Sequence, residues 1–429
     1  MDDWNPAHPP RPFFYGLEEG GFAHPTVIKR WPVIVTDCIN TVLRHSTPAN
    51  TAQAGKVVAM LSALKYELDR LRPFTFAEPA TITSDQDPST TTKTNDHETA
   101  AANWALYWKK AIADHFPTHS FLTASWLFAE CLLYARIHAA FLSQTLWADF
   151  DVFLDDKKKG FRDLKDKIVR ITESHERLIS TVSSETPSET FRPHLRDLLL
   201  LSLWGNATDL SMFAGLSASE IEQMRSGASG QENIISNHIP EILNYICNSG
   251  RFEPSTTSDK PRRIDFILDN SGFELFSDLL LADYLHQTGR VQETVFHCKT
   301  IPWFVSDTMP SDFEWLLTAL EDPSNFFTTT ESFNPTPMKS LAARYRGYIS
   351  SGAWKITSDP VWCTFWAHHH LKTEAPALFN GIKENSLLVI FKGDLNYRKL
   401  VYDCKWDATT PFESVLGSVG EWPAVISLR

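Results

Sequence analysis

The chain has 429 residues, of which 43% are hydrophobic and 21% are charged, and this composition is typical of globular proteins and not of disordered ones. Lys and Arg number 40 and Asp and Glu number 52, so the formal net charge is −12. The acidic balance argues against a protein that binds nucleic acid through its phosphate backbone, because such binding needs a basic face.

The N-terminus and the cysteines indicate the compartment. The first residues, MDDWNPAHPPRPFF, contain no basic segment followed by an apolar one, so no secretory signal is predicted. The six cysteines are far apart and form no CxxC pair, which favours a reducing compartment over a disulfide framework or a zinc cluster. We therefore expect a cytoplasmic protein, with the nucleus as an alternative.

The first half of the chain is expected to be helical. Apolar residues at helical spacing predict helices over Lys56–Leu71, Ala102–Phe116 and Ser120–Leu142. The third of these holds the most apolar long stretch, but Glu130, Arg136 and His138 interrupt it, so a buried helix is expected and not a membrane span. Thr81–Thr99 is rich in Thr, Ser and Asp and predicts a surface loop.

The character of the chain then changes. The charge run Asp155–Lys167 predicts a solvated helix face, and Ser183–Pro193 (SSETPSETFRP) predicts a connector. Short β-branched and apolar runs begin beyond this connector. We therefore expect a helical N-terminal domain over residues 1–190 and a second domain over residues 191–429.

Four short runs in the second half predict β-strands. These runs are Arg263–Leu268, Glu293–Cys298, Ser386–Phe391 and Ala424–Leu428. Strands that alternate with helical patterns predict an α/β fold, with a mostly parallel sheet and helices on both faces. Such sheets bind ligands beyond the carboxyl ends of their strands.

Polar residues follow each of these predicted strands. They are Asp269 and Asn270 after the first, Lys299 and then Asp307 after the second, Lys392, Gly393, Asp394 and Asn396 after the third, and Arg429 after the fourth. Asp269, Asn270 and Asp307 offer hard oxygen ligands, which suit Mg²⁺ or Mn²⁺. The alternative is that Asp269 and Asn270 only form a turn and cap the helix predicted over Gly272–His286.

The segment GDLNYRKL after the third strand carries groups that could bind a sugar phosphate. Gly393 lets a ligand approach the backbone, and Asp394 and Asn396 can bind hydroxyl groups. Arg398 offers a bidentate fork to phosphate. The alternative is a solvated loop with ordinary charges.

Two other polar motifs are weaker. In LWGNATDLS, the spacing of Asn206 and Asp209 would place both on one face at a helix end, as neighbours of a site or as simple caps. The triple histidine His368–His370 has no partner ligands at suitable spacing and predicts an exposed turn or helix, not a metal site.

Several cofactor and catalytic motifs are absent. No GxGxxG or GxxxxGK[ST] follows a strand, and the sequence contains neither GxSxG nor HExxH. Ser226–Gly230 (SGASG) follows a helical pattern, so it does not predict the loop that binds a methyl-donor cofactor.

Four strings resemble the metal-dependent damage-control phosphatase family. In chain order they are LWGNATDLS, ILDNSGFELFSDLLLADYL, HCKTIPWFVSDT and FKGDLNYRKL. The closest match is to the subfamily of acidic-residue methyltransferase-like proteins, which act as sugar-phosphate phosphatases. FAHPTVIKRWPVI, LKYELDRL and WLFAECLLYARI in the first half match as well, so the resemblance spans nearly the whole chain.

The resemblance implies a helical N-terminal region packed on a Rossmann-like α/β/α domain. It implies that Asp269, Asn270 and Asp307 hold a divalent metal ion and take part in catalysis, and that Asp269 and Asn270 also touch substrate. Mn²⁺ is favoured, with Mg²⁺, Co²⁺ or Ni²⁺ as alternatives. The further substrate-binding residues that it implies are Gly393, Asp394, Leu395, Asn396, Tyr397, Glu130, Arg136, Asn206 and Asp209. Lys299, Lys392 and Arg398 also follow predicted strands, and we expect them to be phosphate-binding cations.

The expected function is hydrolysis of phosphomonoesters of small metabolites, with fructose 1-phosphate and fructose 6-phosphate favoured. Either a metal-activated water or Asp269 itself would attack the phosphoryl group. The expected partner is a small phosphorylated molecule, with no nucleic acid and no membrane, and the sequence leaves the oligomeric state open.

Two other functions are possible alternatives. One follows from differences between this sequence and the family's pattern, and the other follows from the subfamily's name. Ser271 replaces the family's usual Ala, and Val401–Cys404 (VYDC) replaces a Gly-Asp-Arg pattern. The sequence stops at Arg429, where the family's Arg-Thr-x-Lys motif would begin. Without the phosphate-binding Lys, a charge-assisted hydrogen bond of about 1.5–3 kcal/mol is lost, so an inactive family member is one alternative. The other is an S-adenosylmethionine-dependent protein-glutamate carboxyl methyltransferase.

Overall fold

A computed structural model of the chain describes residues 9–70, 72–76, 91–206, 234–253, 260–327 and 333–429. Five parallel strands form one sheet in the order β3-β2-β1-β4-β5. They are β1 (Arg263–Ile267), β2 (Glu293–Cys298), β3 (Trp354–Ser358), β4 (Ser386–Lys392) and β5 (Val425–Leu428). The four strands predicted from the sequence are confirmed, with small differences at their ends. The edge strand β3 was not predicted, because most of its short sequence (WKITS) is exposed and forms no apolar run.

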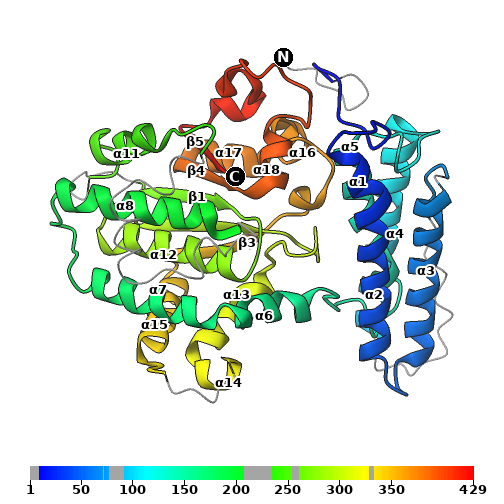
Figure 1. Cartoon of the computed structure of the whole chain (residues 1–429), viewed down its shortest axis with the longest axis horizontal. Coiled ribbons are helices and arrows are strands. Elements are labelled where there is room, and N and C mark those ends of the chain that lie inside the picture. Colours follow the sequence, from blue (N-terminus) through cyan, green and yellow to red (C-terminus); the bar gives the residue numbers. More distant parts are fainter. Residues whose placement is uncertain (1–8, 71, 77–90, 207–233, 254–259, 328–332) are drawn as a thin grey trace.

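Alternate side chains of the sheet pack on two different hydrophobic clusters. In β1, Ile264 and Phe266 belong to one cluster, whereas Ile267 belongs to the other. In β4, Ile390 belongs to the first cluster and Val389 to the second. Because successive residues of a strand point to opposite faces, helices cover both sides of the sheet. The fold is therefore α/β and Rossmann-like, as predicted (Figure 1).

The helices of the sheet region divide between its two faces. The first cluster includes residues of α7 (Lys165–Ile179), α8 (Ser188–Leu203), α11 (Ile239–Asn248), α12 (Phe273–Gln287), α13 (Pro310–Glu321), α14 (Pro323–Phe327) and α15 (Thr336–Ser351). The second includes residues of α16 (Leu371–Glu374), α17 (Pro376–Asn385) and α18 (Gly393–Leu400). Short 3-10 turns complete this region: η3 (Trp204–Asn206), η4 (Pro360–Cys363), η5 (His368–His370), η6 (Phe412–Val415) and η7 (Gly417–Glu421).

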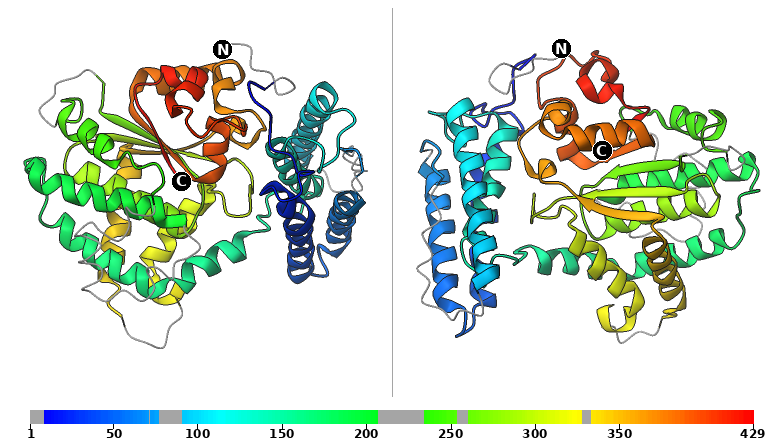
Figure 2. Two further views of the ribbon diagram at one scale, coloured as in Figure 1. Left: turned by 45° about the horizontal axis from the view of Figure 1, so that its top comes forward. Right: turned by 180° about the vertical axis from the view of Figure 1, so that it is seen from behind.

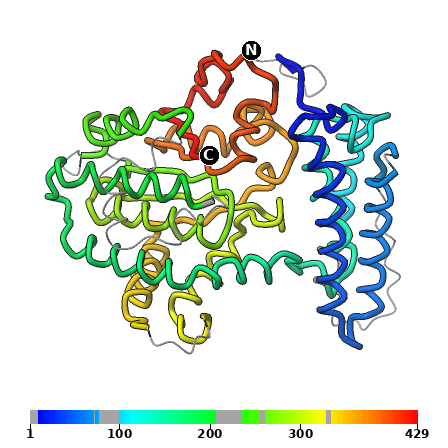
Figure 3. The backbone as a smooth tube through the Cα atoms, viewed as in Figure 1, coloured from blue at the N-terminus to red at the C-terminus, as the bar shows by residue number. Residues whose placement is uncertain are grey.

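The N-terminal helices form a bundle beside the sheet region, as Figures 1 and 2 show. They are α1 (Ala23–Pro25), the π-turn η1 (Thr26–Arg30), α2 (Trp31–His45), α3 (Thr51–Arg70), α4 (Thr91–His115) and α5 (Trp126–Leu142). Their hydrophobic cluster also takes in Trp303, Phe365 and Leu395 from the sheet region, so the two parts share a packed boundary. Helix α6 (Leu154–Asp163) leads from the bundle to the helices that follow it (Figure 3). The division into residues 1–190 and 191–429 stays a prediction.

The predicted helices of the first half are confirmed with different ends. Helix α4 begins at Thr91, so residues 91–99 of the predicted loop are helical, and residues 81–90 lie outside the described ranges. Helix α5 begins at Trp126, not at Ser120. Helix α8 begins at Ser188, inside the predicted connector. The sequence places such boundaries poorly, because polar residues are common both in loops and on the solvent side of helices.

One prediction of exposure holds for most of its charged residues and fails at Lys157, and a second is wrong. The charge run that was predicted to be a solvated helix face contains Lys157, which is buried against two carboxylates. The triple histidine His368–His370 is buried as well. Asp312, which pairs with Lys157, and Asn396, which contacts His368, lie far away in the chain, and a local pattern does not reveal them. Within the described ranges, no helix combines the length and the apolar character that crossing a membrane requires.

Candidate functional site

The candidate site lies where the order of strands along the sheet reverses. The chain passes from β1 to β2 on one side and later returns to β4 on the other side of β1, so the carboxyl ends of β1 and β4 flank the topological switch point, where parallel sheets bind ligands. Asp269 follows β1 and Gly393 follows β4. A Cβ atom on Gly393 would lie 1.8 Å from Oδ2 of Asp269, so the Gly393 backbone packs directly on this carboxylate.

The segment after β2 brings Asp307 to the same place. Asn270 and Asp307 pair through an isolated antiparallel bridge. The backbone N–H of Thr308 donates to the carbonyl of Asp269 at 2.7 Å, and that of Ser271 donates to the carbonyl of Ser306 at 2.8 Å. The structure therefore brings together Asp269, Asn270 and Asp307, which come from two separate segments of the sequence.

The Asp307 segment has a strained backbone that the bundle supports. Phe304 and Val305 have φ angles of 44° and 70°, which are unfavourable for residues other than Gly and most unfavourable for β-branched Val. Tyr134 of α5 stacks on the Phe304 ring at 4.7 Å, and Trp303 is fully buried. Packing against the helical bundle thus helps to hold the loop in the shape that presents Asp307.

The two carboxylates are buried close to like charges. Burial raises the pKa of Asp269 well above its ordinary value, and the charges of Asp307 and Glu274 raise it further. Burial also raises the pKa of Asp307, to about 6, although the nearby Lys299 ammonium opposes this shift. Buried carboxylates with raised pKa values gain stability from an added positive charge.

Lys299 supplies part of that charge. It is buried, and its Nζ lies 3.2 Å from Oδ2 of Asp307 and donates to the carbonyl of Leu268 at 2.7 Å. Apart from this ion contact, Oδ2 of Asp307 accepts no well-aligned hydrogen bond from the described residues. Lys299 thus pairs directly with Asp307, and Oδ2 of Asp307 keeps the capacity to accept a hydrogen bond or bind an ion.

These residues fit a divalent cation in part. Two buried carboxylates with an available oxygen are suitable ligands for a hard ion such as Mn²⁺ or Mg²⁺. Within the described ranges, however, no three or more His, Cys, Asp or Glu side chains group as metal ligands, so Asn270 would have to supply the third. Its Nδ2 donates to Asp269 at 2.7 Å and to Glu274 at 2.8 Å, and its Oδ1 accepts from Ser306. To bind an ion, the amide would turn its oxygen toward Asp269.

The raised pKa of Asp307 predicts a pH dependence of stability. In the folded protein this pKa is about 6, above its ordinary value of 3.8, so the folded state binds the proton more tightly than the unfolded chain does. The metal-free protein should therefore lose on the order of 2–3 kcal/mol from this group as the pH rises from about 4 to about 7. Asp307→Asn does not titrate there. Urea denaturation should show the variant gaining this amount relative to wild type over that range, whereas a constant difference would contradict the raised pKa.

The Lys392 side chain contacts a polar cluster next to the site, formed by Ser202, Asp278 and Glu274. Its buried Nζ donates to Oγ of Ser202 at 2.7 Å and lies 3.0 Å from Asp278 and 3.5 Å from Glu274. Glu274 in turn accepts from Asn270. The predicted phosphate-binding role would require Lys392 to leave these partners, so in this arrangement it supports the site through Glu274.

The predicted substrate-binding loop is the first part of a helix. Gly393 begins α18, and its φ of 75° is readily adopted only by Gly. Asn396 is buried, and its Nδ2 donates to the carbonyls of Ile267, Leu268 and Lys392. Leu395 is buried in the bundle's hydrophobic cluster. Asn396 therefore fixes the end of β1 through these hydrogen bonds, and its role in binding substrate stays a prediction.

Asp394 and Tyr397 lie on the accessible side of α18. The Asp394 side chain is 47% exposed, and its Oδ1 pairs with Arg429 at 2.5 Å. The Arg429 guanidinium lies over the Tyr397 ring, 4.6 Å from its centroid. These two residues keep side-chain surface that a ligand could reach.

Arg398 joins α18 to the helical bundle. Its guanidinium donates to Glu130 of α5 at 2.6 Å and to both carboxylate oxygens of Asp403 at 3.0 Å, and it lies over the Trp126 ring at 3.8 Å. The predicted phosphate fork is therefore engaged by two protein carboxylates. Glu130 also accepts from Nε1 of Trp31, so it too serves this contact.

Removing Arg398 should destabilise the protein strongly. Arg398→Met would leave Glu130 and Asp403 buried without their cation, and breaking a buried pair in this way typically costs about 3–5 kcal/mol. Arg346→Met is the matched control, because Arg346 also binds two carboxylates, Glu314 and Glu321, but at a more exposed position where about 1 kcal/mol or less is expected. Equal losses of unfolding free energy in urea would contradict the assigned role of Arg398.

Of three further predicted residues, one lies in the bundle, one lies near the first turn of α12 and one lies outside the described residues. Arg136 lies in the bundle, where it pairs with Glu67 at 3.1 Å and donates to the carbonyl of Thr75. Asn206 ends η3, whose Gly205 backbone packs against Glu274, so it lies near the first turn of α12. Asp209 lies outside the described residues.

Sequence reasoning missed three charged residues near the site. Glu274 accepts from Asn270, and Lys157 donates to the backbone carbonyl of Asp307. Lys399 is buried, and burial lowers its pKa to about 8. An acidic residue in the first turn of the helix after Asp269 could have suggested Glu274, but no local signal marks the two lysines.

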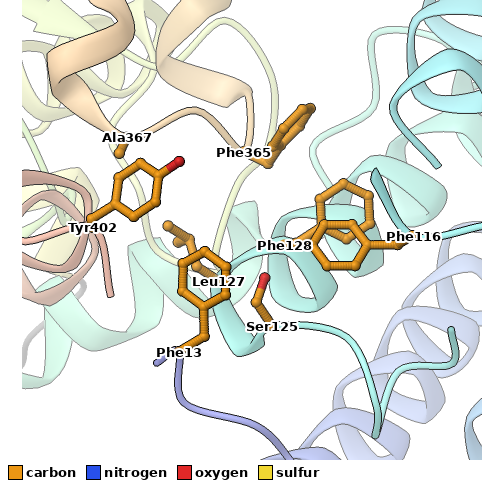
Figure 4. A pocket seen from close by; sticks show the side chains of 8 residues that line it. All are labelled: Phe13, Phe116, Ser125, Leu127, Phe128, Phe365, Ala367 and Tyr402. Carbon is orange, nitrogen blue, oxygen red and sulfur yellow. The ribbon is translucent and has the colours of Figure 1, made fainter. Parts of the chain in front are cut away.

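A recess in the surface lies elsewhere. It holds about 300 Å³ of empty space, part of it open to solvent, and is lined by Phe13, Phe116, Ser125, Leu127, Phe128, Phe365, Ala367 and Tyr402 (Figure 4). None of these is a predicted site residue, and the lining is mostly apolar. The recess lies between the bundle and the sheet region and contributes nothing to the chemistry at Asp269.

The chain is similar in sequence to proteins of one known family. Residues 26–429 match the model of the damage-control phosphatase ARMT1-like domain. The chain is 31% identical to damage-control phosphatase ARMT1 of Mus musculus over 414 residues, which cover 94% of this chain and 87% of the mouse protein. It is 30% identical to the proteins of the same name from Homo sapiens and Xenopus laevis, over 94% and 93% of this chain and 86% of each relative.

Proposed function

This chain belongs to the damage-control phosphatase family with the ARMT1-like domain, and from that membership we propose that it is a metal-dependent phosphatase that hydrolyses phosphomonoesters of small metabolites. Membership in this family supports a phosphatase that acts on metabolites. The metal dependence and the preference for hexose phosphates such as fructose 1-phosphate and fructose 6-phosphate are our proposal.

One observation carries the metal dependence. Asp269 is buried just after β1 and Asp307 is buried in the segment after β2. Their backbones are tied together by the Asn270–Asp307 bridge, and each has a raised pKa. With Asn270, they would hold the ion, for which Mn²⁺ is favoured over Mg²⁺, Co²⁺ or Ni²⁺. Such an ion supplies stabilisation of the negative charge that builds up on a phosphoryl group during transfer.

The protein groups around the pair suit a phosphate ester. Helices α12 and α18 both begin near the carboxylate pair, at Phe273 and Gly393, and the N–H groups at a helix N-terminus favour an anion. Gly393 lets α18 begin directly against Asp269, because the side chain of any larger residue would clash with this carboxylate. Lys299 keeps Asp307 ionised and in position. Either water or Asp269 serves as the nucleophile in this arrangement.

The accessible side chains of Asp394 and Tyr397 support a sugar as the rest of the substrate. A carboxylate accepts hydrogen bonds from sugar hydroxyl groups, and an aromatic ring packs on the apolar face of a sugar. The substrate would thus place its phosphate toward Asp269 and its sugar toward the outer side of α18. The cytoplasm remains the expected compartment, since all six cysteines are buried and unpaired.

A panel of phosphate esters tests this function. Wild-type protein is incubated with hexose phosphates, nucleotides and phosphoserine, with Mn²⁺, Co²⁺, Ni²⁺ or Mg²⁺, and released phosphate is measured before and after a chelator is added. We expect release from hexose phosphates that the chelator stops and Mn²⁺ restores. Release that the chelator leaves unchanged would contradict the metal dependence, and no release from any ester would contradict the phosphatase itself.

The methyltransferase alternative is not favoured. The relatives carry the name phosphatase, and no glycine-rich methyl-donor loop follows a strand in the sequence. The segment Ser226–Gly230 lies outside the described residues. Calorimetric titration with S-adenosylmethionine should therefore give no heat of binding.

A further inference from the structure

We propose that Lys157, a buried lysine on α6, is a positioning residue that anchors the backbone of Asp307 and thereby prepares the carboxylate pair to bind a divalent cation. This inference rests on the proposed function, because it assigns Lys157 a part in the same site. It makes α6, the segment that leads out of the helical bundle, an element of that site.

The contacts of the Lys157 ammonium group define this role. Its Nζ donates to the backbone carbonyl of Asp307 at 3.1 Å, to Oδ2 of Asp312 at 2.9 Å and to Oδ2 of Asp151 at 3.0 Å. The side chain is only 1% exposed. All three donor positions of an ammonium group are therefore used, and one of them is used on the backbone of a proposed metal ligand.

Asp312 extends the anchor along the chain beyond Asp307. Its Oδ2 accepts from the backbone N–H of Met309 at 2.8 Å, and its Oδ1 accepts from Nε1 of Trp315 at 2.6 Å. Lys157 thus holds both the carbonyl of Asp307 and the residue that caps α13. Because the backbone before Asp307 has unfavourable φ angles at Phe304 and Val305, an outside anchor is needed to keep this segment in one shape.

Of the three contacts of Lys157, the hydrogen bond to the Asp307 carbonyl is the one that reaches a proposed metal ligand. A buried lysine needs carboxylate partners, and Asp151 and Asp312 meet this need: burial alone would lower the pKa of Lys157, but these two charges outweigh it and raise the pKa. The Asp307 carbonyl is uncharged, so the hydrogen bond that Lys157 donates to it adds nothing to this charge pairing and instead fixes the backbone of Asp307. Partners that orient a metal ligand in this way typically contribute 10–100-fold to metal affinity.

The test compares Lys157→Met with Arg290→Met. Arg290 is a similarly buried cation that binds Glu253 at 2.6 Å, but it precedes β2 and so lies at the opposite end of the sheet from Asp307. We expect both variants to lower the melting temperature. Only Lys157→Met should weaken Mn²⁺ binding, by about 10–100-fold in calorimetric titration, and only it should speed amide hydrogen exchange in residues 303–308 of the metal-free protein.

A second variant covers the case in which Lys157→Met does not fold. The Lys157, Asp151 and Asp312 side chains carry +1 − 1 − 1 = −1, and Lys157→Met combined with Asp151→Asn keeps this net charge. The double variant should fold and show the same loss of Mn²⁺ affinity and the same faster exchange.

The outcomes separate this inference from the proposed function. Wild-type Mn²⁺ affinity and exchange rates in a folded Lys157 variant would overturn the positioning role and leave the phosphatase standing. If wild type binds no Mn²⁺ and releases no phosphate, the proposed function fails. In that case the exchange rates of residues 303–308 alone decide whether Lys157 anchors the segment.

Discussion

Asp269→Asn should reduce metal-dependent phosphate release by at least about 10³-fold and, at the same time, raise the melting temperature of the metal-free protein. The loss of activity is expected because the substitution removes one of two carboxylates that would hold the ion, and also the candidate nucleophile. The gain in stability is expected because the pKa of Asp269 lies well above its ordinary value. At pH 7 its ionised form therefore costs folding free energy that a neutral amide does not.

Asp265→Asn is the matched control for this prediction. Asp265 is equally buried and lies in β1, but burial, which would raise its pKa, is outweighed by hydrogen bonds from His297 and Arg263, so its pKa is lowered. The control should therefore lose stability and keep its activity. Phosphate release and thermal unfolding without metal measure both quantities. Full activity in Asp269→Asn would contradict the place of Asp269 in the site. A lower melting temperature of this variant would contradict the raised pKa of Asp269.

Gly393→Ala should nearly abolish activity and destabilise the protein by about 2 kcal/mol or more. Its Cβ would meet Oδ2 of Asp269 at 1.8 Å and Cγ at 2.2 Å, far inside van der Waals contact. Asp269 cannot easily move away, because its backbone carbonyl accepts from Thr308 and its Oδ2 accepts from Asn270. The positive φ adds strain of its own, so the cost exceeds that of an ordinary Gly-to-Ala change.

Gly352→Ala separates the two causes. Gly352 ends α15 with a φ of 78°, close to the 75° of Gly393, but a Cβ there meets no atom within 4 Å. This control should lose about 1 kcal/mol and keep its phosphatase activity. Urea denaturation and phosphate release are measured for both variants. If Gly393→Ala loses no more stability and no more activity than Gly352→Ala does, the close packing of α18 on Asp269 is wrong.

The sequence was sufficient to predict the residues at the strand ends. Asp269 and Asp307 follow apolar runs that are strands in the structure, and the carboxyl ends of parallel strands meet at one edge of a sheet. Gly393 was predicted for close approach to a ligand, and the structure places it directly against Asp269. These positions are predictable because they depend on local periodicity and on one topological rule.

The partners of the charged residues could not be predicted. Arg398, Lys392 and Lys157 each pair with carboxylates from other elements, and the nearest sequence neighbours of each do not indicate which ones. Whether a cation faces a ligand or a buried carboxylate depends on tertiary packing, mainly on how α5 and α6 meet the sheet region. The same reason explains the buried histidines, because His368 contacts Asn396 of α18 and Phe391 of β4.

The central claim is that Asp269 and Asp307 together hold one divalent cation. Crystals grown with Mn²⁺ and measured near its X-ray absorption edge test this claim directly, because anomalous scattering locates manganese without assumptions about its ligands. We predict one strong peak between the Asp269 and Asp307 carboxylates, beneath Gly393, that is lost in Asp269→Asn. A peak at another site, or none at this one at saturating Mn²⁺, would contradict the account.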